Sequence, residues 1–343
     1  MDTTIATPTL VLRTYRGPED HPAMTRVAAA VRAFNGDAEL GTVADMDNYY
    51  GHLEHADLPR DCALVELDGR VVAYGRASWE ELANGDRQVG CILNLDPAMR
   101  GRGIEELLVG HALRRAAELI VQIGRDRTTR AIVYVTGRDP DQRRVVELRG
   151  LRQVRRGAQL IRPTFDDIPE LPIPEPLRIR PIGPADRAMH RRIFEADTRA
   201  FADSYGQEAP SETRFDEFIN QPTFDPTLWR VAFDGDVIAG QILSYMGEQA
   251  APDGSRIGWT EAISVQPEYR RRGLARALLA ESLRTVRDAG ATSAGLGVDT
   301  QNPNQALTLY ESLGFRIVSE TFEYEWGPFG PGETPWLDEG SIR

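Results

Sequence analysis

The residues with the clearest potential for chemistry form a short basic loop that contains Gly273 and Ala275. The loop runs from an alternating, strand-like stretch into a segment whose leucines recur at helical spacing. The first backbone N–H groups of a helix have no partner within it and carry the positive end of its dipole. Gly273 would let a ligand approach this backbone closely, and the small Ala275 keeps the next turn clear. We therefore expect a pyrophosphate group to bind here.

The elements that would position this loop follow from hydrophobic periodicity and from helix start signals. Asn302-Pro303 is a favourable helix start, with a capping residue followed by proline at the first helical position. The pattern predicts strands over Trp259–Val265, Ser293–Val298, Phe315–Ser319 and Thr321–Trp326, and helices over Gly273–Ala289 and Pro303–Leu313. Strands that alternate with helices predict an α/β fold with a mixed sheet.

The chain also repeats itself, with four short motifs recurring in the same order about 165 residues later. The matching pairs are Gly17–Asp20 with Gly183–Asp186, Asp68-Gly69 with Asp234-Gly235, Pro97–Gly103 with Pro267–Gly273, and Asp139–Gln142 with Asn302–Gln305. Each Asp-Gly pair lies between alternating β-rich runs and predicts a hairpin. We interpret the chain as a duplicated domain.

A proline-rich stretch separates the two copies and predicts an extended linker. Five prolines lie within Arg162–Pro176. We therefore predict a first domain over residues 1–165, a linker over 166–176 and a second domain over 177–343.

Composition excludes several classes of protein. The 343 residues are 41% hydrophobic and 27% charged, which is typical of globular proteins. The net charge of −12 disfavours binding to nucleic acid or to anionic membranes. Two cysteines form neither a disulfide framework nor a metal-ligand spacing, and neither a signal peptide nor a membrane span is visible. We expect a cytoplasmic protein without a metal, and leave open whether it is a monomer or a homodimer.

The second copy resembles the GCN5-related N-acetyltransferase (GNAT) family. The resemblance is carried by Arg270-x-x-Gly273-x-Ala275 and by Asn302 with Leu309–Phe315. It implies two tandem domains of this family, each with a mixed, mostly antiparallel sheet flanked by helices, and acetyl-CoA as co-substrate. In this family the pantetheine arm lies between two splayed strands. The residues that the resemblance places at the cofactor are Ile263, Val265, Arg270, Arg271, Gly273, Leu274, Ala275, Arg276 and Asn302.

The resemblance also suggests catalytic roles for two residues. Glu261 lies on the strand that leads into the loop, where related enzymes often carry a carboxylate, and we expect it to act as the general base. Tyr310 would protonate the departing thiolate. Backbone N–H groups near Val265 would stabilise the thioester oxygen as negative charge develops on it. Glu323 and Glu325 remain alternative bases.

The first copy departs from this pattern at the positions of the proposed catalytic and pyrophosphate-binding residues. Cys91 aligns with Glu261, and Glu105 aligns with Ala275, where a carboxylate would repel the pyrophosphate. The segment Asp139–Gly150 contains no tyrosine. We expect the first copy to be structural and inactive, and leave open whether it binds CoA.

Several functions are compatible with these residues. We favour acetyl transfer to a small amine in the second domain; the acidic composition favours a cationic acceptor. One alternative is a protein that binds or senses acyl-CoA without turnover, and another is an acetyltransferase of proteins or peptides. Leu296–Phe315 and Phe224–Pro226 also resemble duplicated acetyltransferases of the mycothiol synthase type, whose first half is inactive.

Overall fold

The computed structural model describes residues 9–202, 204–247, 255–301, 306–333 and 335. The first half of the chain holds β1 (Leu10–Thr14), η1 (Pro18–Asp20), α1 (His21–Asn35), α2 (Val43–Gly51), α3 (Leu58–Asp61), β2 (Cys62–Leu67), β3 (Arg70–Glu81), β4 (Arg87–Leu95), η2 (Pro97–Met99), α4 (Ile104–Gln122), β5 (Thr129–Thr136), α5 (Pro140–Leu148) and β6 (Arg152–Arg162). The second half holds β7 (Arg178–Arg180), α6 (Arg187–Ala200), α7 (Glu212–Ile219), η3 (Pro226–Leu228), β8 (Arg230–Asp234), β9 (Val237–Met246), β10 (Ile257–Val265), η4 (Pro267–Tyr269), α8 (Leu274–Asp288), β11 (Ser293–Asp299), α9 (Ala306–Glu311) and β12 (Arg316–Phe329).

The predicted repeat is visible in these elements. The Asp68-Gly69 and Asp234-Gly235 turns connect the hairpins β2–β3 and β8–β9. Each half also has a 3₁₀ turn, a left-handed glycine and a long helix in succession, with Gly103 (φ 79°) before α4 and Gly273 (φ 83°) before α8. The fold class is therefore confirmed as α/β with two tandem units.

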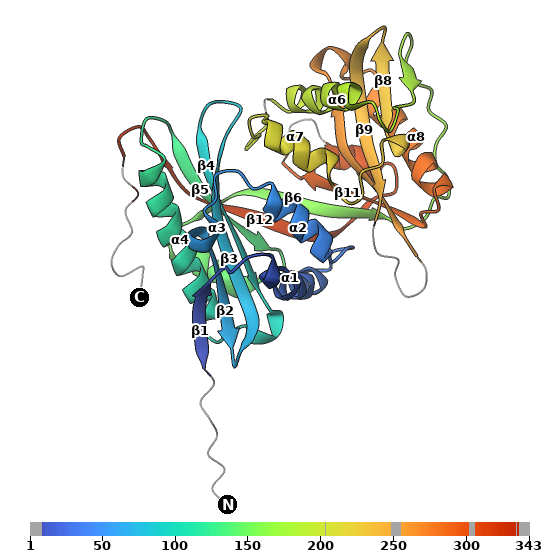
Figure 1. Cartoon of the computed structure of the whole chain (residues 1–343). Helices are drawn as coiled ribbons and strands as arrows, with labels where there is room; N and C mark the ends of the chain where they lie inside the picture. Colours follow the sequence, from blue (N-terminus) through green and yellow to red (C-terminus); the bar gives the residue numbers. More distant parts are fainter. Residues whose placement is uncertain (1–8, 203, 248–254, 302–305, 334, 336–343) are drawn as a thin grey trace, which may run out of the picture.

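The sheet is mixed and mostly antiparallel, as predicted. Among the described strands, β4–β5 and β10–β11 pair in parallel, and the other neighbours pair antiparallel. Helices cover both faces: α4 and α1 pack on the strands of the first half, and α8 and α6 on those of the second (Figure 1). Within the described part of the chain, no helix is long and apolar enough to cross a membrane.

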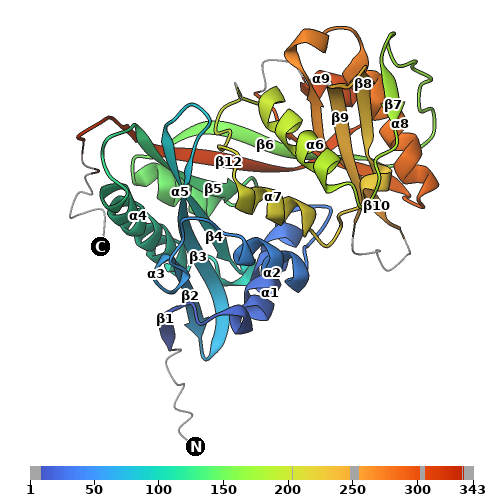
Figure 2. The same ribbon diagram turned by 45° about the horizontal axis from the view of Figure 1, so that its top comes forward.

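The two halves exchange strands. The described strands form one 12-stranded sheet in the order β1-β2-β3-β4-β5-β12-β6-β11-β10-β9-β8-β7. The last strand, β12, lies between β5 and β6 of the first half, while β6 pairs with β11 of the second half (Figure 2). A cut at the predicted linker would separate β12 from both of its neighbours.

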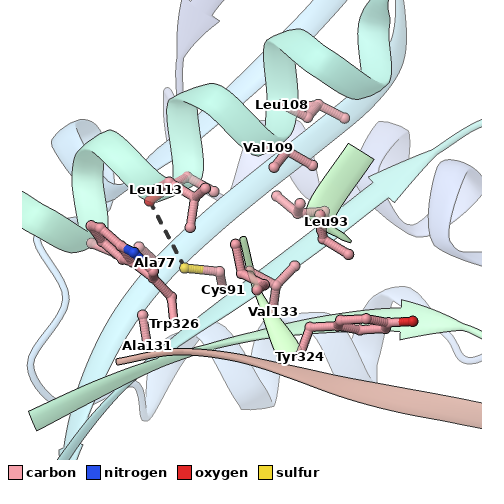
Figure 3. Packing of buried hydrophobic residues seen from close by; sticks show 14 of the residues in the cluster. Ala77, Cys91, Leu93, Leu108, Val109, Leu113, Ala131, Val133, Tyr324 and Trp326 are labelled. Atoms are coloured by element: carbon pink, nitrogen blue, oxygen red, sulfur yellow. Dashed lines mark hydrogen bonds between the residues drawn. The ribbon is translucent and has the colours of Figure 1, made fainter. Parts of the chain in front are cut away.

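The two closing strands predicted from sequence are in fact one. β12 runs unbroken over Arg316–Phe329 and accommodates two register shifts against β6. It continues far enough to reach the core of the first half, where Tyr324, Trp326 and Phe329 are buried with residues of α4 and β4 (Figure 3). The sequence predicts neither this length nor these contacts, because they depend on distant partners.

Candidate functional site

The strand that leads into the loop carries a β-bulge. Glu261 of β10 pairs with Leu243 of β9, but the next pair is Ser264 with Gln241, so β10 has one extra residue. Ala262 takes the left-handed conformation (φ 47°) within this bulge. A bulge re-aims neighbouring side chains and interrupts strand pairing, and both effects are seen here.

Strands β10 and β11 separate just before the bulge. Their parallel pairing covers Ile257–Trp259 of β10 and stops there. The Glu261 carboxylate then reaches across, and its Oε1 accepts the Gly297 N–H at 3.0 Å. In the first half, β4 and β5 stay paired for two residues more, through Cys91, and β3–β4 has no bulge. The splayed strands expected of a pantetheine site are therefore present in the second half.

The loop after β10 offers unpartnered backbone N–H groups. Gly273 is the N-cap of α8, and no side chain of the described residues caps this helix end. Arg271 (φ 60°) and Gly273 (φ 83°) are both left-handed, which turns successive N–H groups to one side, as in anion-binding nests. A Cβ built on Gly273 would meet no atom within 4 Å, so space above the loop is open. A pyrophosphate fits this loop on both counts.

The predicted cofactor residues divide into two groups. Arg271 and Arg276 are exposed and form no ion pair with a described residue, whereas the Arg270 guanidinium donates to the carbonyls of Val265 (3.1 Å) and Ala200 (2.8 Å). Arg270 therefore fixes the end of β10 against α6. The remaining members that the structure describes, Ile263, Val265, Leu274 and Ala275, line the start of the loop and of α8; Asn302 lies outside the described residues.

Glu261 and Tyr310 lie close enough to influence each other. Burial raises the pKa of Glu261 to about 7, against a smaller opposite effect of the Gly297 hydrogen bond. Burial, and then the Glu261 charge, raise the pKa of the Tyr310 phenol well above its usual value. Tyr310 is 6% exposed on α9, and its hydroxyl has no hydrogen-bond partner among the described residues. Near neutral pH the site thus contains a carboxyl group that can gain or lose a proton, that of Glu261, and a phenol that stays protonated, that of Tyr310.

The alternative bases on β12 have other partners. Glu325 is buried, accepts the Tyr205 hydroxyl at 3.1 Å and lies 3.4 Å from the Arg152 guanidinium. Burial, followed by the charge of Asp299, raises the pKa of Glu323. Both carboxylates sit where β12 meets β5 and β6, and no contact joins either to Tyr310.

In the first half, a side chain takes the place that a phosphate would need. Glu105 is buried at the start of α4, and its Oε1 accepts the Gly101 N–H at 2.8 Å. Gly101 corresponds to Arg271 of the second loop, and both are left-handed. The carboxylate expected to repel a pyrophosphate thus also occupies one of the N–H groups that would bind it.

One alignment made from the sequence is wrong. Cys91 was matched to Glu261, but Cys91 pairs with Ala77 and its Sγ points toward the Ala112 carbonyl of α4, at 3.9 Å (Figure 3). Glu261 faces the opposite side of the sheet, because the bulge shifts the alternation by one residue. Ile92 is its structural counterpart. Cys91 is a buried core residue whose pKa burial raises to about 12.

A cavity of about 480 Å³ adjoins Glu261 and Ala262 and lies between the two halves. Its walls include side chains of α2 from the first half, among them Asp45 and Tyr49, which we did not predict as site residues. No sequence motif marks them, because helix α2 reaches the site through tertiary packing. No group of three or more His, Cys, Asp or Glu side chains suited to a metal occurs in the residues that the structure describes.

Comparisons with known proteins agree with this architecture. The chain matches the acetyltransferase (GNAT) family over residues 190–315. It is 31% identical over 258 residues to a mycothiol acetyltransferase of Rhodococcus jostii, covering 74% of this chain and 78% of that protein. A mycothiol acetyltransferase of Nocardiopsis dassonvillei is 31% identical over 275 residues, covering 73% and 77%.

Solved structures resemble the fold along nearly the whole chain. A GCN5-related N-acetyltransferase from Sphaerobacter thermophilus superimposes with a TM-score of 0.69 at 24% identity, covering 92% of this chain and 95% of that one. A tandem GNAT protein from the clavulanic acid biosynthesis pathway does so with a TM-score of 0.64 at 17% identity, covering 94% and 99%. Together with the sequence relatives, these matches show that the chain belongs to the GNAT family of acetyltransferases, enzymes that use acetyl-CoA.

Proposed function

We propose that the second half of the chain transfers an acetyl group from acetyl-CoA to a small amine. The observation that carries this proposal is the end of β10, where pairing with β11 stops at Trp259, Glu261 lines the cavity, and a bulge at Ala262 precedes the uncapped start of α8. The first half has no such bulge, and Glu105 blocks its loop. Acetyl-CoA would supply the acetyl group as a reactive thioester.

The side chains then have distinct tasks. The N–H groups around Arg271 and Gly273 would bind the pyrophosphate, and Arg276 would add positive charge. Glu261 would take a proton from the acceptor's ammonium, directly or through water, so that the neutral amine can attack the thioester carbonyl, and Tyr310 would protonate the departing thiolate. Backbone N–H groups near Val265, in the part of β10 that no longer pairs with β11, would hold the carbonyl oxygen.

The relatives' names support a second candidate for the acceptor. Proteins about 30% identical to this chain over much of its length are named mycothiol acetyltransferases. Under this candidate the acceptor would be the unacetylated amine precursor of mycothiol. Thiol release from acetyl-CoA, measured with this precursor and with a panel of simple amines, separates the two acceptors. If none of these amines causes thiol release, both candidates are contradicted.

Replacing Tyr310 by phenylalanine should lower kcat by about 100-fold, because the thiolate would leave without a proton donor. The dissociation constant of acetyl-CoA should change by less than about twofold, since the phenol does not contact the pyrophosphate loop. Steady-state kinetics and calorimetric titration measure the two effects. Tyr205→Phe removes a hydroxyl that bonds Glu325 elsewhere and serves as the control. An unchanged kcat in Tyr310→Phe would exclude Tyr310 as the acid.

The raised pKa of Glu261 predicts the pH dependence of the reaction. The base is active when deprotonated, so kcat/KM should fall about tenfold per pH unit below pH 7 and level off above it. The acceptor's own ammonium adds a second dependence at higher pH. In Glu261→Gln the inflection near 7 should disappear while the acceptor's dependence remains. A pH profile that keeps the inflection in the variant would assign it to another group.

A further inference from the structure

The cavity beside Glu261 is built by both halves of the chain. The second half contributes residues of α7, of the segment leading to η3, and of β9 and β10. The first half contributes residues from the end of α1 through α2. The two walls meet where the Asn48 side-chain amide donates to the Glu217 carbonyl at 3.4 Å, and the ribbon view shows α7 close to α2 (Figure 2). The inactive half thus forms one wall of the space that opens onto the reactive carboxylate.

Acidic side chains predominate in this cavity. Among the described residues, five carboxylates line it, against one guanidinium, that of Arg32, which donates to the Leu40 carbonyl at 3.0 Å. The acidic lining residues are Glu39, Asp45, Glu217, Asp225 and Glu261.

Besides burial, three of these carboxylates raise the pKa of one side chain, the phenol of Tyr245. The pKa of the Tyr245 phenol is raised first by burial and then by the charges of Glu261, Glu39 and Asp45, while Arg32 partly opposes them. Glu261 belongs to the second half, and Glu39 and Asp45 belong to the first. The negative potential around Tyr245 therefore spans the cavity from the reacting carboxylate to the opposite wall.

Aromatic side chains form another part of the lining. They comprise Tyr49, Phe218, Phe224, Trp229 and Tyr245. Tyr49 is held in place from behind, because the buried Arg76 guanidinium donates to its hydroxyl at 2.8 Å and lies 5.0 Å from its ring centre. Aromatic faces attract cations, and flat rings also pack well against a compact carbon skeleton. An acidic cavity with aromatic walls excludes anions and favours cations of some bulk.

We propose that the acceptor is an amine with a second positive charge on a compact skeleton, and that Glu39 and Asp45 of the first half bind this second charge while the reacting amine faces Glu261. This inference rests on the proposed function and specifies its acceptor. It gives the inactive half a task in substrate selection. Asp45 also caps α2 through the Thr42 N–H at 2.8 Å, so its carboxylate is fixed in position.

Three amines with the same ring test the proposal. They are trans-1,4-diaminocyclohexane, cyclohexylamine and trans-4-aminocyclohexanecarboxylate, which differ in the charge of the second substituent. With the full-length enzyme and acetyl-CoA, kcat/KM for the diamine should exceed that for the monoamine by about tenfold or more, and that for the amino acid by about 100-fold or more. The difference should lie mainly in KM, because the second charge is bound equally in ground and transition states.

Two substitutions locate the effect. In the double variant Glu39→Gln/Asp45→Asn, the preference for the diamine over cyclohexylamine should shrink to about twofold. Asparagine keeps an oxygen acceptor for the Thr42 N–H, and circular dichroism verifies the fold. Glu19→Gln, at an exposed site in the same half, removes one charge outside the cavity and should preserve the preference.

The outcomes distinguish failure of the inference about the second charge from failure of the proposed acetyl transfer. Equal kcat/KM for the diamine and the monoamine, or a preference that survives in the double variant, would overturn the inference while acetyl transfer to amines stands. Failure of all three amines, while the mycothiol precursor or another amine of the panel is acetylated, would overturn the inference alone. Failure of every amine in that panel as well would contradict the proposed function.

Discussion

Replacing Ala275 by glutamate is expected to weaken acetyl-CoA binding by at least about 100-fold, equivalent to about 2.7 kcal/mol. The first half shows the reason, since Glu105 at the corresponding position accepts the Gly101 N–H at 2.8 Å. The same carboxylate in the second half would accept the Arg271 N–H and place a negative charge where the pyrophosphate binds. An acid in the first turn stabilises a helix by about 0.3–1 kcal/mol, so the melting temperature should not fall. Calorimetric titration and a thermal melt measure both effects.

The neutral variant Ala275→Gln is the matched control. It adds a side chain of the same size without the charge, and its loss of affinity should be several-fold smaller. Gly103→Glu adds a carboxylate at the first loop and should leave the affinity of the second site unchanged; because Gly103 is left-handed (φ 79°), a thermal melt must first show that this variant is folded. Wild-type affinity in a folded Ala275→Glu protein would show that acetyl-CoA does not use this loop.

Replacing Tyr324 by alanine is expected to lower the free energy of unfolding by about 3–5 kcal/mol, as for other large buried side chains. Tyr324 is 1% exposed, and its hydroxyl donates to the Glu147 carboxylate at 2.8 Å. Although it lies near the end of the chain, its side chain packs in the core beneath α4 of the first half. The loss should therefore appear in the first half, and chemical denaturation monitored by hydrogen exchange in α4 measures it.

A milder variant and a shortened chain sharpen this test. Tyr324→Phe removes one hydrogen bond and should cost about 1 kcal/mol. A chain of residues 1–165 lacks β12 and should not fold cooperatively unless residues 166–343 are supplied. A stable, cooperatively folded first half without β12 would contradict the strand exchange.

The features that sequence predicted well are local ones. The Asp-Gly hairpins, the strand before the loop and the helix after Gly273 depend on neighbouring residues, whose spacing the chain displays directly. The impaired loop of the first half was predicted for the same reason, because Glu105 is adjacent to the N–H groups that it meets.

The bulge at Ala262 was beyond prediction. One extra residue in a strand leaves the alternation of side chains plausible on either side, and pairing with β9 alone reveals it. This single residue determines which face Glu261 points to, and it is why the match of Glu261 with Cys91 failed. Alignment by motif spacing tracks the loop well but misplaces the strand before it.

Contacts between the halves were equally out of reach. That β12 inserts between β5 and β6, and that Asp45 and Tyr49 border the cavity beside Glu261, depend on segments far apart in the chain. The sequence predicts an inactive, structural first copy and gives no sign that its residues line the cavity beside Glu261. The domain limits at residues 165 and 177 stay predictions about the duplication.

The interlaced position of β6 and β12 has a consequence for the history of this gene. Once two duplicated units have exchanged their last strands, neither unit can be deleted, because its loss would leave strands of the other unit without a pairing partner. Decay of catalysis in the first unit would then be tolerated, but its deletion would not. If the first unit is inactive, a copy preserved in this way can acquire another function, and the cavity that it borders with the second unit is the place where that function would arise.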